Sequence, residues 1–346
     1  MNVKIGLIGK GNVGTSFLKI LKEKKDFLKE KFNLNYKVIA VFEYDGAIIN
    51  ETGIDLEELL EIENNFRELP YWNKNLRANE MISKLDIDIY VETTPTNHET
   101  GEPALSHIIN ALSNGIDVVS SNKGPFYLQY NRIINLAKEK GCFVKYEGVV
   151  ASCVPALSIS DCLIGNNITN IRAILNGTCN YILSRMSAEG ITLPIALKEA
   201  QELGYAEADP TLDIEGFDAA GKLVILANKL FGWSKTIKDV KIRGITKITS
   251  QALDLAKSDG FVIKHLALVE NDELIVEPRL IEKDSPLNIS GTFNVIELNT
   301  KYAGPIVLIG RGAGGFEAAS AILNDIINIA KNRGYIHNLS EKRNIS

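Results

Sequence analysis

Apolar residues follow two patterns along the first 150 positions of this chain. Short apolar runs, typical of buried strands, alternate with longer stretches in which apolar residues return every three or four positions, as on an amphipathic helix. The runs predict strands at 3–8, 36–42, 86–91, 117–120 and 142–146, with helices at 14–30, 103–115 and 126–140. Thr100 is the expected N-cap of the second helix. Alternating strands and helices predict a parallel sheet with right-handed crossovers, a doubly wound α/β domain over residues 1–148.

The pattern changes after a linker of small residues at 147–155. Strands are predicted at 171–175, 262–269, 274–281, 295–298 and 306–309, and helices at 181–188, 193–203 and 217–231. The later strands follow one another without intervening helices, which predicts a largely antiparallel sheet with helices on one face. We expect an α+β domain over residues 149–310. A last helix at 316–332, within residues 311–346, is expected to return to the first domain.

The first predicted strand leads into the loop Gly9-Lys10-Gly11-Asn12-Val13-Gly14, which opens the first helix. Between a strand and a helix, this spacing is the Rossmann fingerprint of dinucleotide binding. Gly9 permits the tight turn, Gly11 leaves room for a pyrophosphate, and Gly14 lets helix and strand approach closely. The N-terminus of the helix also favours phosphate. The expected cofactor contacts here are Gly9, Gly11, Asn12, Val13 and Gly14.

Glu43 ends the second predicted strand. In this fold an acidic residue at that place binds the ribose hydroxyls and repels a 2′-phosphate. The next basic residue along the chain is Arg67, so no arginine follows closely. The pattern therefore favours NAD over NADP, with Tyr44 and Asp45 as alternative ribose ligands.

Further candidates follow the strands whose C-terminal ends face the ligand in a doubly wound sheet. Thr93 and Thr94 come after the strand at 86–91 and are expected to touch the cofactor. His98 is either a base or, as its setting favours, a polar loop residue. Lys123 lies in the turn Ser121–Pro125 after the strand at 117–120, where it either binds substrate or cofactor or is a solvated turn residue.

The segment from Gly204 to Lys222 holds the densest chemistry. It contains one lysine and five carboxylates, at Glu207, Asp209, Asp213, Glu215 and Asp218. Its second half enters the helix at 217–231, whose early turns are apolar nearly all round, so we expect a buried helix. Asp218 and Lys222 lie one turn apart on that helix. A solvated ion pair is the simpler interpretation, but a buried charged pair favours a functional role.

A second glycine-rich turn, Gly310–Gly315, precedes the last helix. It either binds phosphate or forms a tight strand-to-helix corner. Gly312 is our candidate for a close approach of backbone to the cofactor.

Composition excludes several classes of protein. The 346 residues carry a net charge of −5, which argues against nucleic acid as the main partner because binding phosphates needs a basic surface. No apolar run approaches a membrane span, and no signal-peptide pattern opens the chain. The four cysteines are scattered, with no CxxC pair or histidine cluster, so neither a zinc site nor a disulfide framework is expected. These features predict a cytoplasmic protein.

Four features, in this order, resemble the homoserine dehydrogenase family over nearly the whole chain. They are Gly9–Gly14, Ser121–Pro125, Asn176–Leu183 and Tyr205–Lys222, and the last includes the run Asp-x-x-Gly-x-Asp-Ala-Ala-x-Lys. The resemblance implies an NAD(P)-dependent oxidoreductase that interconverts L-aspartate-4-semialdehyde and L-homoserine, on the route to threonine, methionine and isoleucine. It also implies that the second domain binds this amino-acid substrate and forms homodimers or homotetramers. The chain is similar to the short form, without an aspartokinase segment or a regulatory ACT domain.

The resemblance further implies roles for individual residues. Glu207, Asp213 and the region of Gly177 and Thr178 would hold the substrate ammonium, a task that suits carboxylates. Asp218 and Lys222 would sit at the reacting oxygen, with Lys123 as the second lysine at the substrate. A lysine there can stabilise developing negative charge and supply the proton; which lysine does so is left open.

The family also tends to hold a monovalent cation such as sodium. By resemblance, Glu147 and carbonyls around Val150 would bind it. The chain departs from the family pattern nearby, because Ala151-Ser152-Cys153 stands where a glycine-containing turn is common. It departs again at Glu317, where a threonine is more usual.

Two other functions compete with this one. Another two-domain amino-acid dehydrogenase would need a different carboxylate pattern between Asp213 and Lys222. A nucleotide-binding sensor without catalysis would be expected to have lost Lys123, Asp218 or Lys222, and all three are present. Both observations favour the homoserine dehydrogenase hypothesis.

Overall fold

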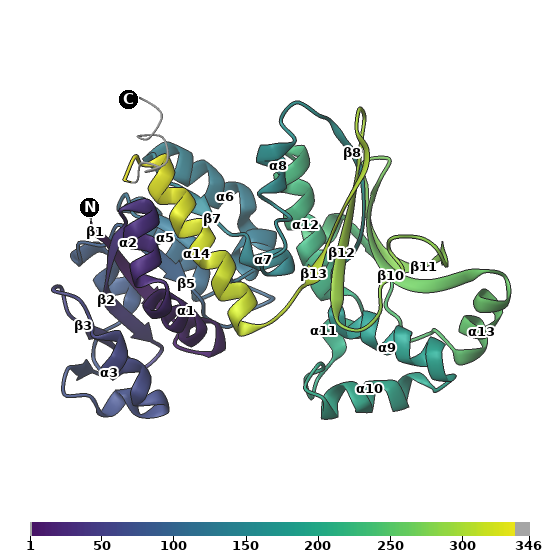
Figure 1. Ribbon diagram of the computed structural model, residues 1–346, viewed down its shortest axis with the longest axis horizontal. Helices are drawn as coiled ribbons and strands as arrows, with labels where there is room; N and C mark the ends of the chain where they lie inside the picture. Colours follow the sequence, from purple (N-terminus) through teal and green to yellow (C-terminus); the bar gives the residue numbers. More distant parts are fainter. Residues whose placement is uncertain (1, 336–346) are drawn as a thin grey trace. The chain divides into compact units, whose positions relative to one another are not determined.

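The computed structural model describes residues 2–335 (Figure 1). The chain forms two compact units. Unit 1 comprises Met1–Val149 and Gly314–Ser346, and unit 2 comprises Val150–Ala313. The sequence had placed the divisions after residues 148 and 310.

Unit 1 is built on a seven-stranded sheet. Its strands are β1 (Asn2–Ile8), β2 (Asn35–Glu43), β3 (Gly46–Ile49), β4 (Trp72–Asn73), β5 (Ile89–Glu92), β6 (Asp117–Ser120) and β7 (Val144–Lys145). They lie in the order β4-β3-β2-β1-β5-β6-β7. The five strands from β2 to β7 in that order pair in parallel, which confirms the predicted doubly wound sheet. β3 and β4 extend one edge in antiparallel fashion and were not predicted, because both are short.

The helices of unit 1 correct two predictions. They are α1 (Asn12–Glu23), α2 (Lys25–Phe32), α3 (Leu56–Glu61), α4 (Ala78–Met81), α5 (Ala104–Ser113), α6 (Gly124–Lys140) and α14 (Gly315–Asn332), with 3-10 turns η1 (Glu63–Glu68) and η2 (Ile82–Lys84). The single helix predicted at 14–30 breaks at Lys24, since the charged run around it offers no apolar side chain to the core. Thr100 is not an N-cap, because α5 starts only after Pro103.

The last helix belongs to the core of unit 1. Figure 1 shows α14 running beside α1, although some 300 residues separate them in the sequence. Ile322 and Ile326 of α14 share one apolar cluster with Phe17 and Leu21 of α1. The two N-terminal ends also meet, since a Cβ on Gly315 would lie 2.4 Å from the Asn12 side-chain oxygen.

Unit 2 contains a six-stranded sheet. Its strands are β8 (Ile168–Ile174), β9 (Val240–Ile242), β10 (Phe261–Glu270), β11 (Glu273–Glu282), β12 (Phe293–Thr300) and β13 (Gly304–Arg311), in the order β13-β12-β8-β10-β11-β9. All neighbours are antiparallel except β9 and β11. The predicted antiparallel sheet is therefore confirmed, with β9 as an unpredicted parallel edge strand.

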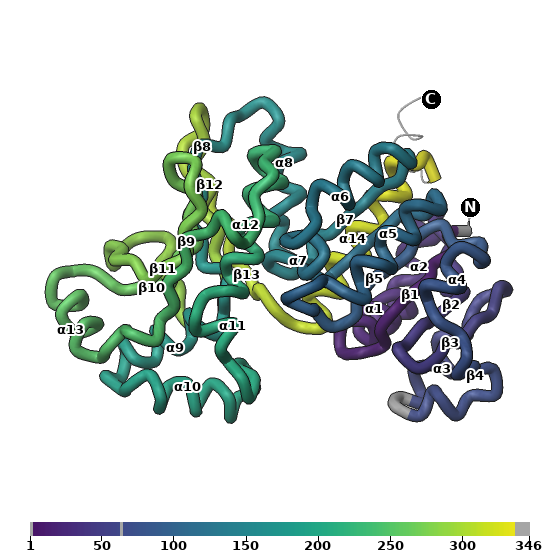
Figure 2. The backbone as a smooth tube through the Cα atoms, turned by 180° about the vertical axis from the view of Figure 1, so that it is seen from behind, coloured from purple at the N-terminus to yellow at the C-terminus, as the bar shows by residue number. Residues whose placement is uncertain are grey.

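The remaining helices show where local patterns were insufficient. They are α7 (Gly148–Ala151), α8 (Ile159–Cys162), α9 (Gly177–Glu189), α10 (Leu193–Glu202), α11 (Thr211–Ile214), α12 (Phe217–Phe231), η3 (Ile237–Asp239) and α13 (Ser250–Ser258). The helix at 217–231 is as predicted. The linker at 147–155 is partly helical, α9 starts four residues earlier than expected, and α11 and α13 were missed. From behind, α9, α10 and α11 lie together at one end of unit 2 (Figure 2), around a buried cluster that includes Ile182, Met186 and Ala196.

Within residues 2–335, no helix combines the length and the apolar character needed to cross a membrane.

Candidate functional site

Gly9 and Gly14 are required by the packing of unit 1 itself. Gly9 has φ +89°, a conformation that favours glycine, and its N–H donates to the Phe42 carbonyl at 2.9 Å. A Cβ on Gly14 would lie 1.9 Å from the Gly9 carbonyl oxygen. These two glycines bring β1, β2 and the start of α1 together, which is the geometry that the fingerprint predicts.

Gly11 differs from both. It is exposed, has φ −71°, and a Cβ built on it would meet no atom within 4 Å. Nothing inside the chain therefore requires a glycine there. Gly11 precedes α1, and Asn12 is also exposed, so the very start of the helix, whose first N–H groups have no partner within the helix, is accessible. This arrangement can accept an anion such as a pyrophosphate.

Glu43 is tied to the same loop, because its carboxylate accepts a hydrogen bond from the Lys10 N–H. The sequence argument that no arginine lies near Glu43 is wrong, because Arg67 is distant along the chain but close in the folded structure. Arg67 returns to Asp45 and donates two hydrogen bonds to its carboxylate, of 2.8 and 3.0 Å. These bonds lower the pKa of Asp45. The Arg67 guanidinium also lies 4.7 Å from the centre of the Phe66 ring, so a cation is held close to the end of β2.

Thr93 and Thr94 use their hydroxyls within unit 1. The Thr93 hydroxyl lies 2.8 Å from the Ile8 carbonyl oxygen and 2.7 Å from that of Gly9, which fastens the end of β5 to the glycine-rich loop. The hydroxyl and N–H of Thr94 both donate to the Glu92 carboxylate. Glu92 is fully buried and its other oxygen lies 3.0 Å from His107 Nδ1. Glu92 was not among the predicted site residues.

Asn122, also unpredicted, fixes the turn that contains Lys123. It is 2% exposed, and its side-chain NH₂ donates to the Thr94 and Pro95 carbonyls at 3.0 and 3.1 Å. Its Oδ1 accepts from the Gly124 N–H at 3.1 Å. Lys123 is half-buried and stands at the N-terminus of α6. The loops after β5 and β6 are thus joined directly beside the candidate lysine.

In unit 2, α12 carries the predicted charged pair. The Lys222 ammonium lies 2.8 Å from Asp218 Oδ2 and donates to the Leu175 carbonyl at 2.9 Å. Asp218 is 6% exposed, so the expectation of a buried rather than a solvated pair is correct for this residue. Ala219, Ala220 and the next turns of α12 are buried around it. An ammonium held in this way is fixed in position and still has one N–H donor for a ligand.

A second carboxylate is connected to the pair through Asn176. Its side-chain NH₂ donates to Asp218 Oδ2 at 3.0 Å and to Asp213 Oδ1 at 2.6 Å. From the sequence, Asn176 was noted only as the first residue of the run Asn176–Leu183. The cluster that results contains two carboxylates, one amide and one ammonium. Buried Cys179 also contacts it, and burial raises the pKa of its thiol, which argues against a thiolate nucleophile there.

The other substrate candidates surround this cluster less closely. Gly177 and Thr178 open α9, and the Thr178 hydroxyl donates to the Tyr205 carbonyl at 2.7 Å. A Cβ on Gly177 would lie 2.6 Å from the Thr292 carbonyl oxygen, so packing alone explains this glycine. Glu207 is exposed on the turn before α11. Gly312 is buried, and a Cβ there would lie 2.1 Å from the Asn294 amide, so its backbone approaches a side chain of the protein.

Glu147 directly precedes α7 and Val150 lies within it, and both are buried. The Glu147 N–H donates to Asp325 Oδ2 at 2.9 Å. Burial raises the pKa of Asp325 to about 7. Two residues beyond Val150, Ser152 has φ +51°, so the chain keeps a left-handed turn where it lacks the expected glycine.

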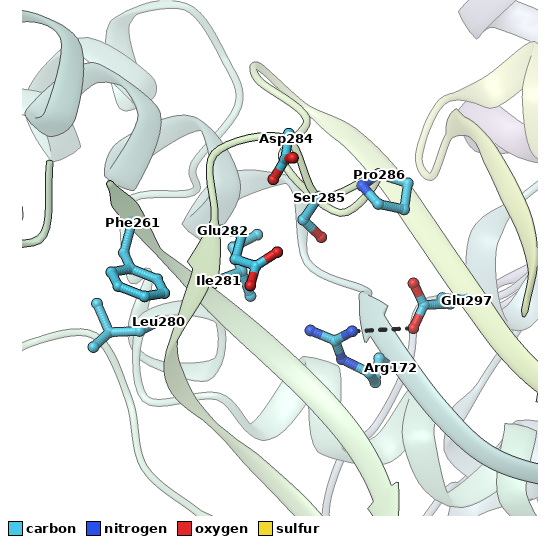
Figure 3. A pocket seen from close by; sticks show the side chains of 9 residues that line it. All are labelled: Arg172, Phe261, Leu280, Ile281, Glu282, Asp284, Ser285, Pro286 and Glu297. Carbon is cyan, nitrogen blue, oxygen red and sulfur yellow. Dashed lines mark hydrogen bonds and ion pairs between the residues drawn. The ribbon is translucent and has the colours of Figure 1, made fainter. Parts of the chain in front are cut away.

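One further pocket lies on the sheet of unit 2, away from the predicted residues (Figure 3). It has a volume of about 480 Å³ and is bounded by Arg172 of β8, Glu297 of β12 and the turn Asp284–Pro286. Arg172 donates to Glu297 at 3.2 Å across its floor. No group of three or more His, Cys, Asp or Glu residues suited to a metal ion occurs in the described part of the chain.

Comparison with known proteins gives one consistent result. A family model described as the NAD-binding domain of homoserine dehydrogenase matches residues 9–147, and one described as homoserine dehydrogenase matches residues 154–327. A homoserine dehydrogenase of Methanocaldococcus jannaschii is 45% identical over 327 residues, which cover 93% of this chain and 97% of that protein. An NAD(+)-dependent homoserine dehydrogenase of Pseudomonas canavaninivorans is 34% identical, covering 94% of this chain and 96% of that one. The structure of a hyperthermophilic archaeal homoserine dehydrogenase in complex with NADPH is 30% identical, with a TM-score of 0.84 and coverage of 96% and 98%.

Proposed function

Since this chain belongs to the homoserine dehydrogenase family, we propose that it interconverts L-homoserine and L-aspartate-4-semialdehyde by hydride transfer with NAD or NADP. This reaction lies on the route to threonine, methionine and isoleucine. The observation that carries the proposal is the buried Lys222–Asp218 pair, joined through Asn176 to Asp213. An ammonium beside two carboxylates matches a substrate that bears a reacting oxygen and an ammonium.

Lys222 is the proposed acid/base group. A bound nicotinamide cofactor would supply the hydride that reduces the carbonyl carbon of the semialdehyde, and negative charge would then develop on the carbonyl oxygen. An ammonium fixed by Asp218 and the Leu175 carbonyl can stabilise that charge and give up the proton that forms the hydroxyl. In the reverse direction the lysine receives this proton. Lys123, at the start of α6, is the second candidate for the same role.

Asp213 is the proposed main ligand of the substrate ammonium, with Glu207 and the Gly177–Thr178 segment as further contacts. Asp213 is half-buried and held by Asn176, whereas Glu207 is exposed on a turn. A fixed carboxylate loses less conformational entropy on binding than a mobile one, so we rank Asp213 above Glu207.

For the cofactor, we propose that the exposed N-terminus of α1 binds the pyrophosphate, and that Gly9, Gly11, Asn12, Val13 and Gly14 shape that place. Gly11 supports this assignment because its lack of a side chain serves nothing inside the chain. Thr93, Thr94 and Gly312 are retained as neighbours of the cofactor that act through backbone. Glu43 favours NAD because its charge repels a 2′-phosphate. Arg67, paired with Asp45 nearby, supplies a positive charge that would attract the 2′-phosphate of NADP.

We also propose a monovalent cation, such as sodium, at Glu147 and the backbone carbonyl of Val150. The chemistry of the donor set supports it. Glu147 is 8% exposed beside the carboxylate of Asp325, and a cation would relieve the cost of burying these groups. One carboxylate combined with backbone carbonyl oxygens suits a hard ion of low charge.

A homodimer or homotetramer formed through unit 2 completes the proposal. β13 is an edge strand of the six-stranded sheet, and all four residues of its apolar run Ile306–Ile309 are partly or largely exposed. An exposed apolar edge strand is a liability that proteins normally cover. The four cysteines are free thiols, which fits a reducing compartment such as the cytoplasm.

The test is oxidation of L-homoserine by the purified chain, followed as formation of reduced cofactor with NAD and NADP in parallel. Activity with either cofactor is expected. Binding of a cofactor without any turnover of homoserine would refute the proposal and would direct attention to other amino-acid alcohols.

A further inference from the structure

Asn176 stands at the centre of the charged cluster of unit 2. It follows β8, caps the N-terminus of α9 and is 5% exposed. Its side-chain oxygen accepts the Cys179 N–H at 2.8 Å, and its NH₂ group donates to both Asp213 and Asp218. Every hydrogen-bonding atom of this side chain is therefore used.

The oxygen contact fixes which way the amide faces. Because the Cys179 N–H can only donate, Oδ1 must point to α9 and the NH₂ must point to the two carboxylates. The same contact holds the side chain against the helix end, as an N-cap does. The direction of the NH₂ group is thus set by the backbone of β8 and α9.

The NH₂ group solves an electrostatic problem. Two carboxylates near one another repel, and Lys222 makes an ion pair with Asp218 at 2.8 Å. A neutral group with two N–H bonds can hold both carboxylates at once, which neither a hydroxyl nor another acid can do. Asn176 is the residue that joins Asp213, on α11, to Asp218, on α12.

We infer that Asn176 is a positioning residue for the reaction, which sets Asp213 and Asp218 at the spacing that the substrate ammonium and the reacting oxygen require. The inference rests on the proposed function. It assigns no contact with substrate to Asn176 itself. It predicts that the NH₂ group, and not the cap on α9, is what catalysis depends on.

Two substitutions separate these roles. Asn176→Asp keeps an oxygen that caps α9 as well as asparagine does, but it replaces the NH₂ with an oxygen and so adds a third carboxylate to the cluster. Asn176→Ser keeps a capping hydroxyl and removes both donors without adding charge. Asn228→Asp is the matched control. Asn228 is buried on the same helix as Asp218, and its amide bonds the backbone of Lys235, at 2.8 and 2.9 Å.

Steady-state rates with L-homoserine, cofactor affinity and thermal unfolding would be measured for all three variants. We expect kcat/KM of Asn176→Asp to fall about 100-fold at neutral pH, since small misplacements of reacting groups cost about this much. Part of the loss should return as the pH is lowered, because a proton shared among three carboxylates removes their repulsion. Asn176→Ser should lose about 10-fold, through a higher KM and a lower kcat, without this pH response. Cofactor affinity should stay within twofold, and Asn228→Asp should lose stability but keep its kinetic constants.

If Asn176 served only to cap α9, the losses of kcat/KM would follow the reverse order, and Asn176→Asp would behave like the wild type. That result, or a folded Asn176→Ser variant with wild-type kcat and KM, would overturn the assignment while leaving the function intact. If Asn176→Asp fails to fold, Asn176→Ser decides alone. A wild-type chain that does not oxidise homoserine would instead overturn the proposed function, and the assignment with it.

Discussion

Unit 1 and unit 2 each place a buried asparagine two residues after a strand, but the two asparagines hold different groups. Asn122 donates to the carbonyls of Thr94 and Pro95, which are neutral backbone groups. Asn176 donates to the carboxylates of Asp213 and Asp218, which carry charge in their ionised form. The same side chain thus joins two loops in unit 1 and two acids in unit 2.

The same difference, between backbone groups in unit 1 and charged side chains in unit 2, holds for the whole of each candidate site. In unit 1 the glycine-rich loop, the Thr93 hydroxyl and Asn122 together define a backbone shape, and the ligand is expected to meet N–H groups. In unit 2 the ligand is expected to meet an ammonium and carboxylates. Unit 1 should therefore be most sensitive to added volume, and unit 2 to changed charge.

Removing the central charge of unit 2 should have the largest effect. Lys222→Ala is expected to lower kcat about 10³-fold, because a lost general acid typically costs two to four orders of magnitude. Cofactor affinity should change little, since the lysine lies in unit 2. Lys229→Ala, the same change two turns along α12, is the control and should keep its activity. Near-normal turnover of Lys222→Ala would transfer the acid/base role to Lys123, which the matching Lys123→Ala variant would then test.

Asp325 is a buried carboxyl group of unit 1, and its protonation should make the stability of the protein depend on pH. Burial raises its pKa to about 7. In smaller measure, the hydrogen bond from the Glu147 N–H lowers this pKa, the charge of Glu147 raises it and Lys145 lowers it. The folded state therefore keeps a proton that the unfolded chain releases near pH 4, and the free energy of unfolding should fall as pH rises from about 4 to about 7. The slope is at most about 1.4 kcal/mol per pH unit for one proton.

Asp325→Asn should remove this part of the pH dependence and gain stability relative to wild type as pH rises. Urea unfolding at constant salt, from pH 5 to 8, would measure it. Parallel stability curves for the two proteins would mean that Asp325 is ionised throughout.

Added volume separates two glycines of unit 1. Gly11→Ala introduces a Cβ that meets no atom of the chain within 4 Å, so it should cost below about 1 kcal/mol of stability as a weaker N-cap. It should weaken NAD and NADP binding equally, by about 10-fold or more, because the methyl group occupies the space kept for the pyrophosphate.

Gly14→Ala is the contrasting case, because its Cβ would lie 1.9 Å from the Gly9 carbonyl oxygen. Stability and binding should fall together in this variant. If Gly11→Ala binds both cofactors as the wild type does, the pyrophosphate does not lie at the start of α1. Isothermal titration and thermal unfolding of both variants supply the two readouts.

These contrasts also mark what the sequence could reveal. The helix Phe217–Phe231 was predicted with its start at Phe217 and its end at about Phe231, because its apolar pattern and its flanking glycines are local features. Asn176 was not recognised as a site residue, since its partners lie 37 and 42 residues further along the chain. Arg67 was judged too distant from Glu43 for the same reason, although it returns to Asp45. Periodicity reports which side of an element is buried, whereas a bond between distant loops leaves no periodic trace.

Glu43 is the charged exception within unit 1. Removing its carboxylate in Glu43→Ala should relax discrimination against NADP, by about 10-fold in the ratio of kcat/KM values, since one repulsive charge typically contributes about that much. Arg67→Ala should shift the same ratio in the opposite direction, towards NAD. Rates with the two cofactors under identical conditions would measure both. Equal ratios in wild type and Glu43→Ala would assign the ribose to another residue at the end of β2.

Substitutions of Ser152 should have the smallest effect. Ser152 lies near the start of unit 2, where backbone conformation rather than charge should determine stability. Its φ of +51° is a conformation that costs a residue with a Cβ about 1 kcal/mol. Ser152→Gly should remove that strain, although glycine loses more backbone entropy on folding, so a net gain below about 1 kcal/mol is expected. Ser152→Ala is the matched control, because it removes the hydroxyl but keeps the Cβ. Urea unfolding should find the alanine variant no more stable than wild type and the glycine variant more stable than both. Equal stability of the two variants would show that the hydroxyl, rather than the left-handed backbone, sets the energy of this turn.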